Sequence, residues 1–117
     1  MTAAYDRALE PAGINAAQLA MLRRVRAVGP LSITELAERL ELERSTATRN
    51  VRVLSRSALV LLRQSDRDRR QTEVALSEHG RLTLERAEPL WAAAQQEFED
   101  RVGAAEAQAL RARVLAL

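Results

Sequence analysis

The chain has 117 residues, of which 47% are apolar and 29% charged, with no cysteine and a formal net charge of +2. This length suits one domain, and the apolar content argues against intrinsic disorder. The lack of cysteine excludes disulfides, thiol redox sensing and the usual structural zinc clusters. No apolar run approaches the length of a membrane span and no signal peptide opens the chain. We therefore expect a soluble, cytoplasmic protein without membrane contact.

Two helices are predicted before residue 30. The first is a short amphipathic segment from Thr2 to Glu10, which Pro11 to Gly13 should break. Asn15 opens the second helix, because Gln18 stands at the position that completes a capping box. Gly29, followed by proline, should end this helix.

The next stretch, from Ser32 to Leu54, predicts two short helices joined by a tight turn. Ser32 and Glu35 form the capping-box pattern at the start of the first helix. The second helix, from Glu43 to Arg56, places the apolar Ala47, Val51 and Leu54 on one face. Its opposite face carries hydroxyl and arginine side chains, which are Ser45, Arg49, Arg52 and Arg56, flanked by Arg44 and Thr48. A helix face of this kind, with no acid after its first residue, suits a DNA major groove.

A hairpin is predicted directly after this helix. Leu59 to Arg63 is a strand-like run, Gln64 to Gln71 forms a polar tip, and Thr72 to Leu76 alternates as a returning strand. Leu31 and Ser32 can add a small third strand. The order of helix, turn, helix and arginine-tipped hairpin predicts a winged helix-turn-helix, an α+β fold that is mostly helical. Such a hairpin can lie along the phosphates or in the minor groove.

The distribution of charge supports contact with nucleic acid. Residues 44–70 hold eight arginines and two acids, a local excess of +6, whereas the rest of the chain holds ten arginines and fourteen acids. Every basic residue is arginine. Arginine suits bidentate contacts to guanine and phosphate, although a GC-rich genome would also favour arginine over lysine.

The C-terminal part predicts two further helices. Ser77 should cap a long helix that runs to about Arg101, with a kink at Pro89 because proline lacks the amide donor. Gly103 should end that helix, and residues 104–117 should form a last one.

Taken together, these segments resemble the MarR family of bacterial transcriptional regulators. The similarity lies in the order and spacing of Pro30 to Leu40, Arg44 to Arg49, Leu59-Val60, Asp68 to Arg70 and Leu76 to Gly80. The chain departs from the family pattern at Glu41 and Ala58, where glycine is usual. If the backbone at Ala58 is left-handed, alanine costs on the order of 1 kcal/mol there.

The resemblance implies a homodimeric regulator, a repressor that responds to a small-molecule effector and binds double-stranded DNA without a cofactor. It also implies that one wing arginine, Arg67 or Arg69, enters the minor groove. The expected DNA contacts are Arg44, Ser45, Thr46, Thr48, Arg49, Arg52, Arg67, Asp68, Arg69 and Arg70.

We expect a single domain with two functional parts, in which residues 14–90 form the DNA-binding core and residues 1–13 and 91–117 form dimerisation helices. The apolar stripes of these helices supply the predicted dimer contacts, which are Tyr5, Leu9, Trp91, Phe98, Leu110, Val114 and Leu117. A large apolar patch left exposed on a monomer would be unusual. Trp91 and Phe98 have an alternative role as the lining of an effector pocket.

Other function classes are less well supported by the sequence. The single histidine, His79, has no partner that would indicate catalysis or metal binding, and neither a phosphate loop nor a nucleophile motif occurs. An enzyme is therefore not expected, and no metal site is predicted. The main alternative is a winged-helix protein-interaction module or an antagonist that does not bind DNA. The salt dependence of duplex binding distinguishes these classes.

Overall fold

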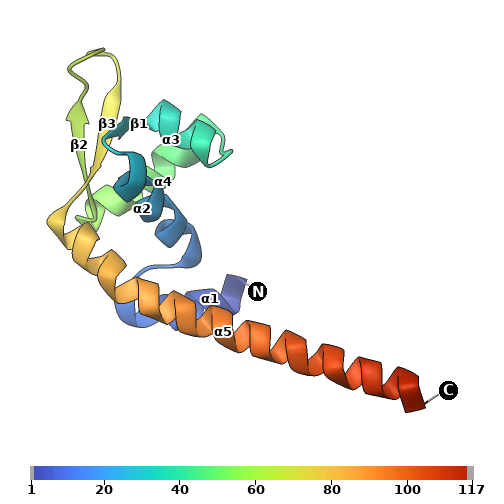
Figure 1. The fold of residues 1–117 in the computed structure, drawn as a ribbon. Coiled ribbons are helices and arrows are strands. Elements are labelled where there is room, and N and C mark those ends of the chain that lie inside the picture. The colour runs from blue at the N-terminus through green and yellow to red at the C-terminus, as the bar shows by residue number, and fades with distance from the viewer. Residues whose placement is uncertain (1, 116–117) are drawn as a thin grey trace.

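The computed structural model describes residues 2–115 as a winged-helix core from which one long helix extends (Figure 1). Two elements precede the core, namely α1 (Thr2–Leu9) and a 3-10 turn, η1 (Glu10–Ala12). The core and the long helix contain α2 (Ala16–Val28), β1 (Leu31–Ser32), α3 (Ile33–Arg39), α4 (Arg44–Arg56), β2 (Val60–Gln64), β3 (Thr72–Leu76) and α5 (Glu78–Leu115). The fold is thus mostly helical with a small sheet, which confirms the predicted winged helix-turn-helix.

Both predicted capping boxes are present and fix the starts of α2 and α3. The Asn15 side chain accepts a hydrogen bond from the Gln18 amide at 2.8 Å, and the Gln18 side chain accepts from the Asn15 amide at 2.9 Å. Ser32 and Glu35 exchange the corresponding pair of bonds at the start of α3. Each box satisfies two backbone donors that a helix end otherwise leaves free.

The sheet has three antiparallel strands in the order β1-β3-β2. Leu31 lies opposite Val74 in the first pair, and Val60 lies opposite Leu76 in the second. The predicted third strand at Leu31 and Ser32 is therefore confirmed. Beneath the sheet, the buried faces of α2, α3 and α4 meet in one core built from aliphatic side chains, including the fully buried Leu54.

The predicted end of the long helix at Gly103 is wrong. α5 is a single helix of 38 residues that passes through both Pro89 and Gly103. A glycine costs only about 1 kcal/mol inside a helix, and the alanines that follow Gly103 favour helix. None of the helices described over residues 2–115 is long and apolar enough to cross a membrane.

The N-terminal helix, α1, packs along α5, as Figure 1 shows. One of its residues, Leu9, was predicted to lie in the dimer surface but packs in the core of its own chain. Leu9 is fully buried within the chain. Gly13, with a φ of 79°, ends η1 and turns the chain back toward α2. Because Leu9 is covered by its own chain, its assignment to the dimer surface is wrong.

The turn that ends α4 has a left-handed backbone at Ala58, where φ is 59°, so the condition under which alanine is costly there is met. The Leu59 amide donates to the Leu54 carbonyl at 2.9 Å, the bond that closes a helix ending in a left-handed residue. We expect Ala58→Gly to raise the free energy of unfolding by about 1 kcal/mol, because glycine adopts this conformation without strain. Urea denaturation measures the change.

Ala93 provides the matched control for this prediction, since it is exposed in the middle of α5. Ala93→Gly should lower the free energy of unfolding by about 1 kcal/mol. If the two substitutions changed stability in the same direction, strain at residue 58 would be refuted.

Candidate nucleic-acid interface

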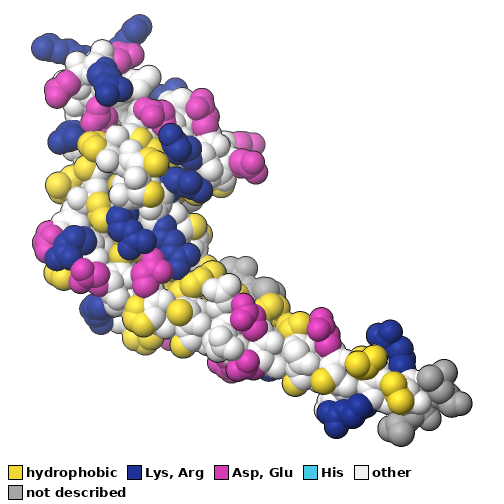
Figure 2. Space-filling view, in the orientation of Figure 1, with side chains coloured by type: hydrophobic (Ala, Val, Ile, Leu, Met, Phe, Trp, Pro, Cys, Tyr) yellow, Lys and Arg dark blue, Asp and Glu magenta, His cyan; other side chains and the backbone are white. Residues whose placement is uncertain are grey.

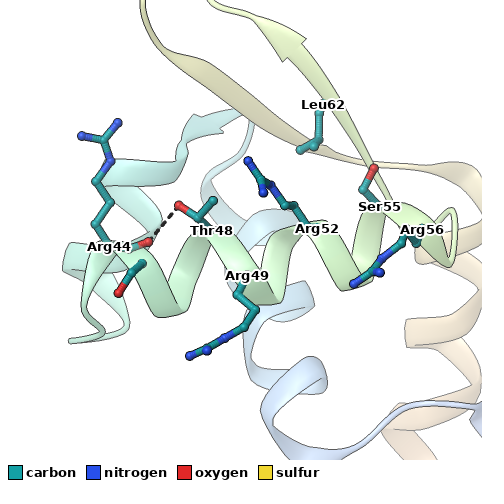
Figure 3. Close-up of a pocket in the computed structure, with 8 residues that line it drawn as sticks. Arg44, Thr48, Arg49, Arg52, Ser55, Arg56 and Leu62 are labelled. Atoms are coloured by element: carbon teal, nitrogen blue, oxygen red, sulfur yellow. Dashed lines mark hydrogen bonds between the residues drawn. The ribbon is translucent and has the colours of Figure 1, made fainter.

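The outer face of α4 carries the predicted arginine and hydroxyl side chains, while Ala47, Val51 and Leu54 are fully buried on the opposite face. A groove of about 900 Å³ lies between α4 and the hairpin. It is lined by the exposed Arg44, Ser45, Arg49, Arg52, Arg56 and Leu62 and by the half-buried Thr48 and Ser55. The Thr48 hydroxyl donates to the Arg44 carbonyl at 2.8 Å, within the helix itself (Figure 3).

Arg49 and Arg52 leave α4 in different directions. In Figure 3, Arg52 points to the side of the hairpin strand that carries Leu62, whereas Arg49 points to the other side of the helix. Within residues 2–115, none of the four groove arginines forms an ion pair. Their charges are therefore available to an external anion.

A second groove, of about 260 Å³, lies where α3, α4 and the hairpin meet. Arg44, Thr48, Arg52 and Leu62 belong to both grooves, and the second is completed by Ser32, Ile33, Thr34, Arg70, Gln71 and Thr72. The residues predicted from the sequence do not include Leu62, Ser55, Thr34 or Gln71. The alternation of the hairpin strands could have found Leu62, because Val60 and Leu62 share one face of β2.

The tip of the hairpin is held by its own hydrogen bonds. The buried Ser65 hydroxyl accepts from the amides of Arg67 and Asp68, at 3.2 and 3.4 Å. Asp68 accepts from the backbone and the side chain of Arg70, at 3.0 and 3.3 Å, so this acid pairs with a neighbouring arginine. The tip is thus shaped before any ligand is present.

Arg67 and Arg69 are exposed at this tip. Figure 2 shows basic side chains projecting from the end of the hairpin. In the described part of the chain, neither residue is in an ion pair. By contrast, Thr46 is half-buried and lines neither groove, so the fold does not bring this predicted contact to the surface formed by the others.

Comparison with known proteins identifies the family of this core. A model described as the MarR family matches residues 12–71, from the end of η1 to the hairpin tip. The chain belongs to the MarR family. The sequence matches none of the curated proteins with which it was compared.

Solved structures of the MarR type are similar in fold to this chain over most of its length. The transcriptional regulator MosR from M. tuberculosis, crystallised in complex with DNA, is 34% identical, with 95% of this chain and 87% of that chain covered and a TM-score of 0.77. Apo MarR from E. coli is 24% identical, with coverages of 97% and 87% and a TM-score of 0.79. The transcriptional repressor CouR, bound to a 23-mer DNA duplex, is 24% identical, with coverages of 98% and 82% and a TM-score of 0.82. Two of these relatives are thus described as a regulator or a repressor of transcription.

In this MarR-family chain, a cluster of side chains ties α1 and α2 to α5. Arg23 donates two hydrogen bonds to Glu88, at 2.9 and 2.7 Å, and Arg26 adds a third at 3.3 Å. Trp91 lies beneath the Arg23 guanidinium at 5.3 Å and stacks on Tyr5 with ring centroids 4.2 Å apart. The Arg23 hydrogen bonds hold the pKa of Glu88 below its usual range, and the same contacts raise the pKa of Arg23.

The predicted dimer residues have different surroundings. Tyr5 and Phe98 line a groove of about 400 Å³ between α1 and α5, and Trp91 is half-buried against the core. Leu110 and Val114 are 61% and 59% exposed near the end of α5. Leu117 lies outside the described residues. Figure 2 shows apolar side chains along the visible face of α5.

No metal-binding cluster is found in the described region. Residues 2–115 contain no group of three or more histidine, aspartate or glutamate side chains that could hold a metal ion. His79 is exposed in the first turn of α5.

Proposed function

We propose that this chain is a cytoplasmic homodimeric repressor that binds DNA sequence-specifically and responds to a small molecule. The observation that carries the DNA-binding part is a recognition helix, α4, beside a preformed hairpin, with four arginines that form no ion pair within residues 2–115. MosR and CouR, whose structures contain DNA, support this proposal by their likeness in fold.

α4 is the element that enters the major groove in this proposal. No side chain caps its N-terminus, because Glu43 makes no capping hydrogen bond. Its first backbone amides therefore remain for a phosphate. Arginines farther along the helix would contact base edges, where bidentate bonds to guanine give most of the discrimination.

The hairpin tip is the second DNA contact in this proposal. Ser65 and Asp68 fix the backbone from which Arg67 and Arg69 project, so less side-chain and loop entropy is lost when the tip meets a phosphate or the minor groove. Arg70 and Gln71, which line the second groove, would contact the sugar-phosphate backbone of the DNA.

Residues 1–13 and 91–117 are proposed to form the dimer, and residues 14–90 the DNA-binding core. The side chains of residues 101–114 are all exposed, and Val102, Leu110 and Val114 among them are apolar. A second copy would cover them, since lone exposed apolar stripes are rare on monomeric proteins. A single recognition helix also reads too few base pairs to select one site in a genome, whereas a dimer reads two half-sites about 34 Å apart.

The ligand response is assigned to the packing between this dimer region and the core. The groove between α1 and α5 is largely apolar, with Phe98 and Val102 among its lining residues. A small molecule that changes how α1 packs on α5 would change the separation of the two recognition helices, and with it the affinity for DNA.

Duplexes selected from a random pool by the wild-type protein test this proposal. Their binding should weaken steeply with salt, because each phosphate contact releases counterions. Arg67→Ala should weaken binding to selected and scrambled duplexes alike and flatten the salt slope by about one for each protomer bound. Fluorescence anisotropy across a salt series measures both quantities.

Arg24→Ala serves as the charge-matched control, because Arg24 is exposed on α2 outside both grooves beside α4. It should bind like the wild type. A protein that selects no duplex, or binds without salt dependence, would instead be a winged-helix interaction module.

A further inference from the structure

The start of α5 is fastened to the turn that ends α4. The Ser77 hydroxyl donates to the Ala58 carbonyl at 2.6 Å and accepts from the Gly80 amide at 2.9 Å. One buried hydroxyl therefore joins the residue that terminates the recognition helix to the first turn of the long helix. The bond to Ala58 joins positions 19 residues apart in the chain, whereas the bond from Gly80 is local.

A second set of contacts fixes the distance between the turn after α4 and the first turn of α5. The Ser77 amide donates to the Leu59 carbonyl at 3.2 Å. A Cβ atom added to Gly80 would lie 2.1 Å from that carbonyl oxygen and 2.8 Å from a methyl group of Leu76. No residue other than glycine fits at position 80 at this separation, because the obstructing atom belongs to the backbone.

We propose that this helix corner, formed by Ala58, Leu59, Ser77 and Gly80, sets the angle between the recognition helix and α5. In the dimeric regulator proposed above, on which this inference rests, that angle determines the spacing between half-sites that the protein accepts. Ser77 and Gly80 are thus positioning residues for operator choice, although neither lines the grooves beside α4.

Because α5 is long, a small change of angle at this corner is amplified at the far end of the helix. A helix of 38 residues is about 57 Å long, so a rotation of a few degrees at its start displaces its far end by several ångströms. Ten base pairs span about 34 Å, and a displacement of that size is comparable with one base-pair step. The Arg23–Glu88 contact ties α5 to α2, whereas the corner acts at the end of α4 itself.

The test uses selected duplexes in which one base pair is inserted or deleted between the half-sites. Wild-type protein should prefer the selected spacing. Ser77→Ala should reduce this preference by about fivefold or more, while base preference within each half-site and the dimer remain unchanged. Ser77→Thr retains the hydroxyl and should keep the wild-type preference for the selected spacing. Anisotropy on the matched set of duplexes gives each ratio, and sedimentation gives the oligomeric state.

Val25→Ala controls for a general loss of stability, because Val25 is buried in α2 and is not part of the corner. This variant should keep the wild-type spacing preference. A wild-type protein that shows no spacing-dependent binding overturns the proposed dimeric function and this inference with it. A selective wild type together with an equally selective Ser77→Ala overturns the role of the corner alone.

Discussion

Replacing Leu110 and Val114 together with glutamate is expected to give a monomer that binds its operator on the order of 10²–10⁴-fold more weakly. Both side chains are apolar and more than half exposed. In the proposed dimer they are buried against a second copy, where carboxylates would have to lose their hydration without a partner. Each half-site would then be bound separately, so the gain from simultaneous binding would be lost.

Sedimentation at tens of micromolar and anisotropy on the selected duplex check this prediction. Gln108 and Ala112 lie about opposite the Leu110 side of the helix, so Gln108→Glu with Ala112→Glu introduces the same charge on the other face. This control should remain dimeric and bind normally. A wild-type chain that is monomeric at this concentration, or a Leu110→Glu/Val114→Glu variant that stays dimeric, would refute the arrangement.

Local signals predicted the core of the fold because each depends on a few neighbouring residues. The capping boxes at Asn15 and Ser32 require side chains three residues apart, and both occur as expected. The left-handed turn at Ala58 was suggested by the resemblance to the MarR family, in which glycine is usual at this position. In each case the chemistry that fixes the backbone is contained in one short segment.

Two predictions were wrong because they depend on more than the local sequence pattern. Gly103 was expected to end a helix, but its small intrinsic cost is outweighed by the alanines after it and by the pair of Glu97 and Arg101 one turn before it. Leu9 lies on an apolar face that could cover either the core or a second chain. The turn at η1 folds this face against the core, so Leu9 is buried within its own chain.

The candidate DNA surface was also predicted only in part. Helical periodicity gave the exposed face of α4 correctly, because the buried positions on the other side are spaced regularly. It did not give Leu62 or Gln71, which reach the grooves from the hairpin. Their positions depend on how β2 and β3 lie against α4, which is a tertiary property.

Arg49→Ala is expected to lower affinity for the selected duplex by about 1–3 kcal/mol per half-site, the discrimination carried by one good base contact. Arg49 lies on the exposed face of α4, in the groove beside the hairpin, and in residues 2–115 it has no ion-pair partner. Its removal should therefore relax preference at one base pair in each half-site. A second round of selection with the variant identifies that base pair.

Arg67→Ala is the matched comparison, since it removes the same charge from the hairpin tip. The two variants should differ in kind: Arg49→Ala should bind the scrambled duplex nearly as well as the wild type, whereas Arg67→Ala should lose affinity for both duplexes. This difference follows because base-edge contacts depend on sequence and phosphate contacts do not. Equal losses on selected and scrambled duplexes for Arg49→Ala would exclude base reading by this residue and leave it as a phosphate contact.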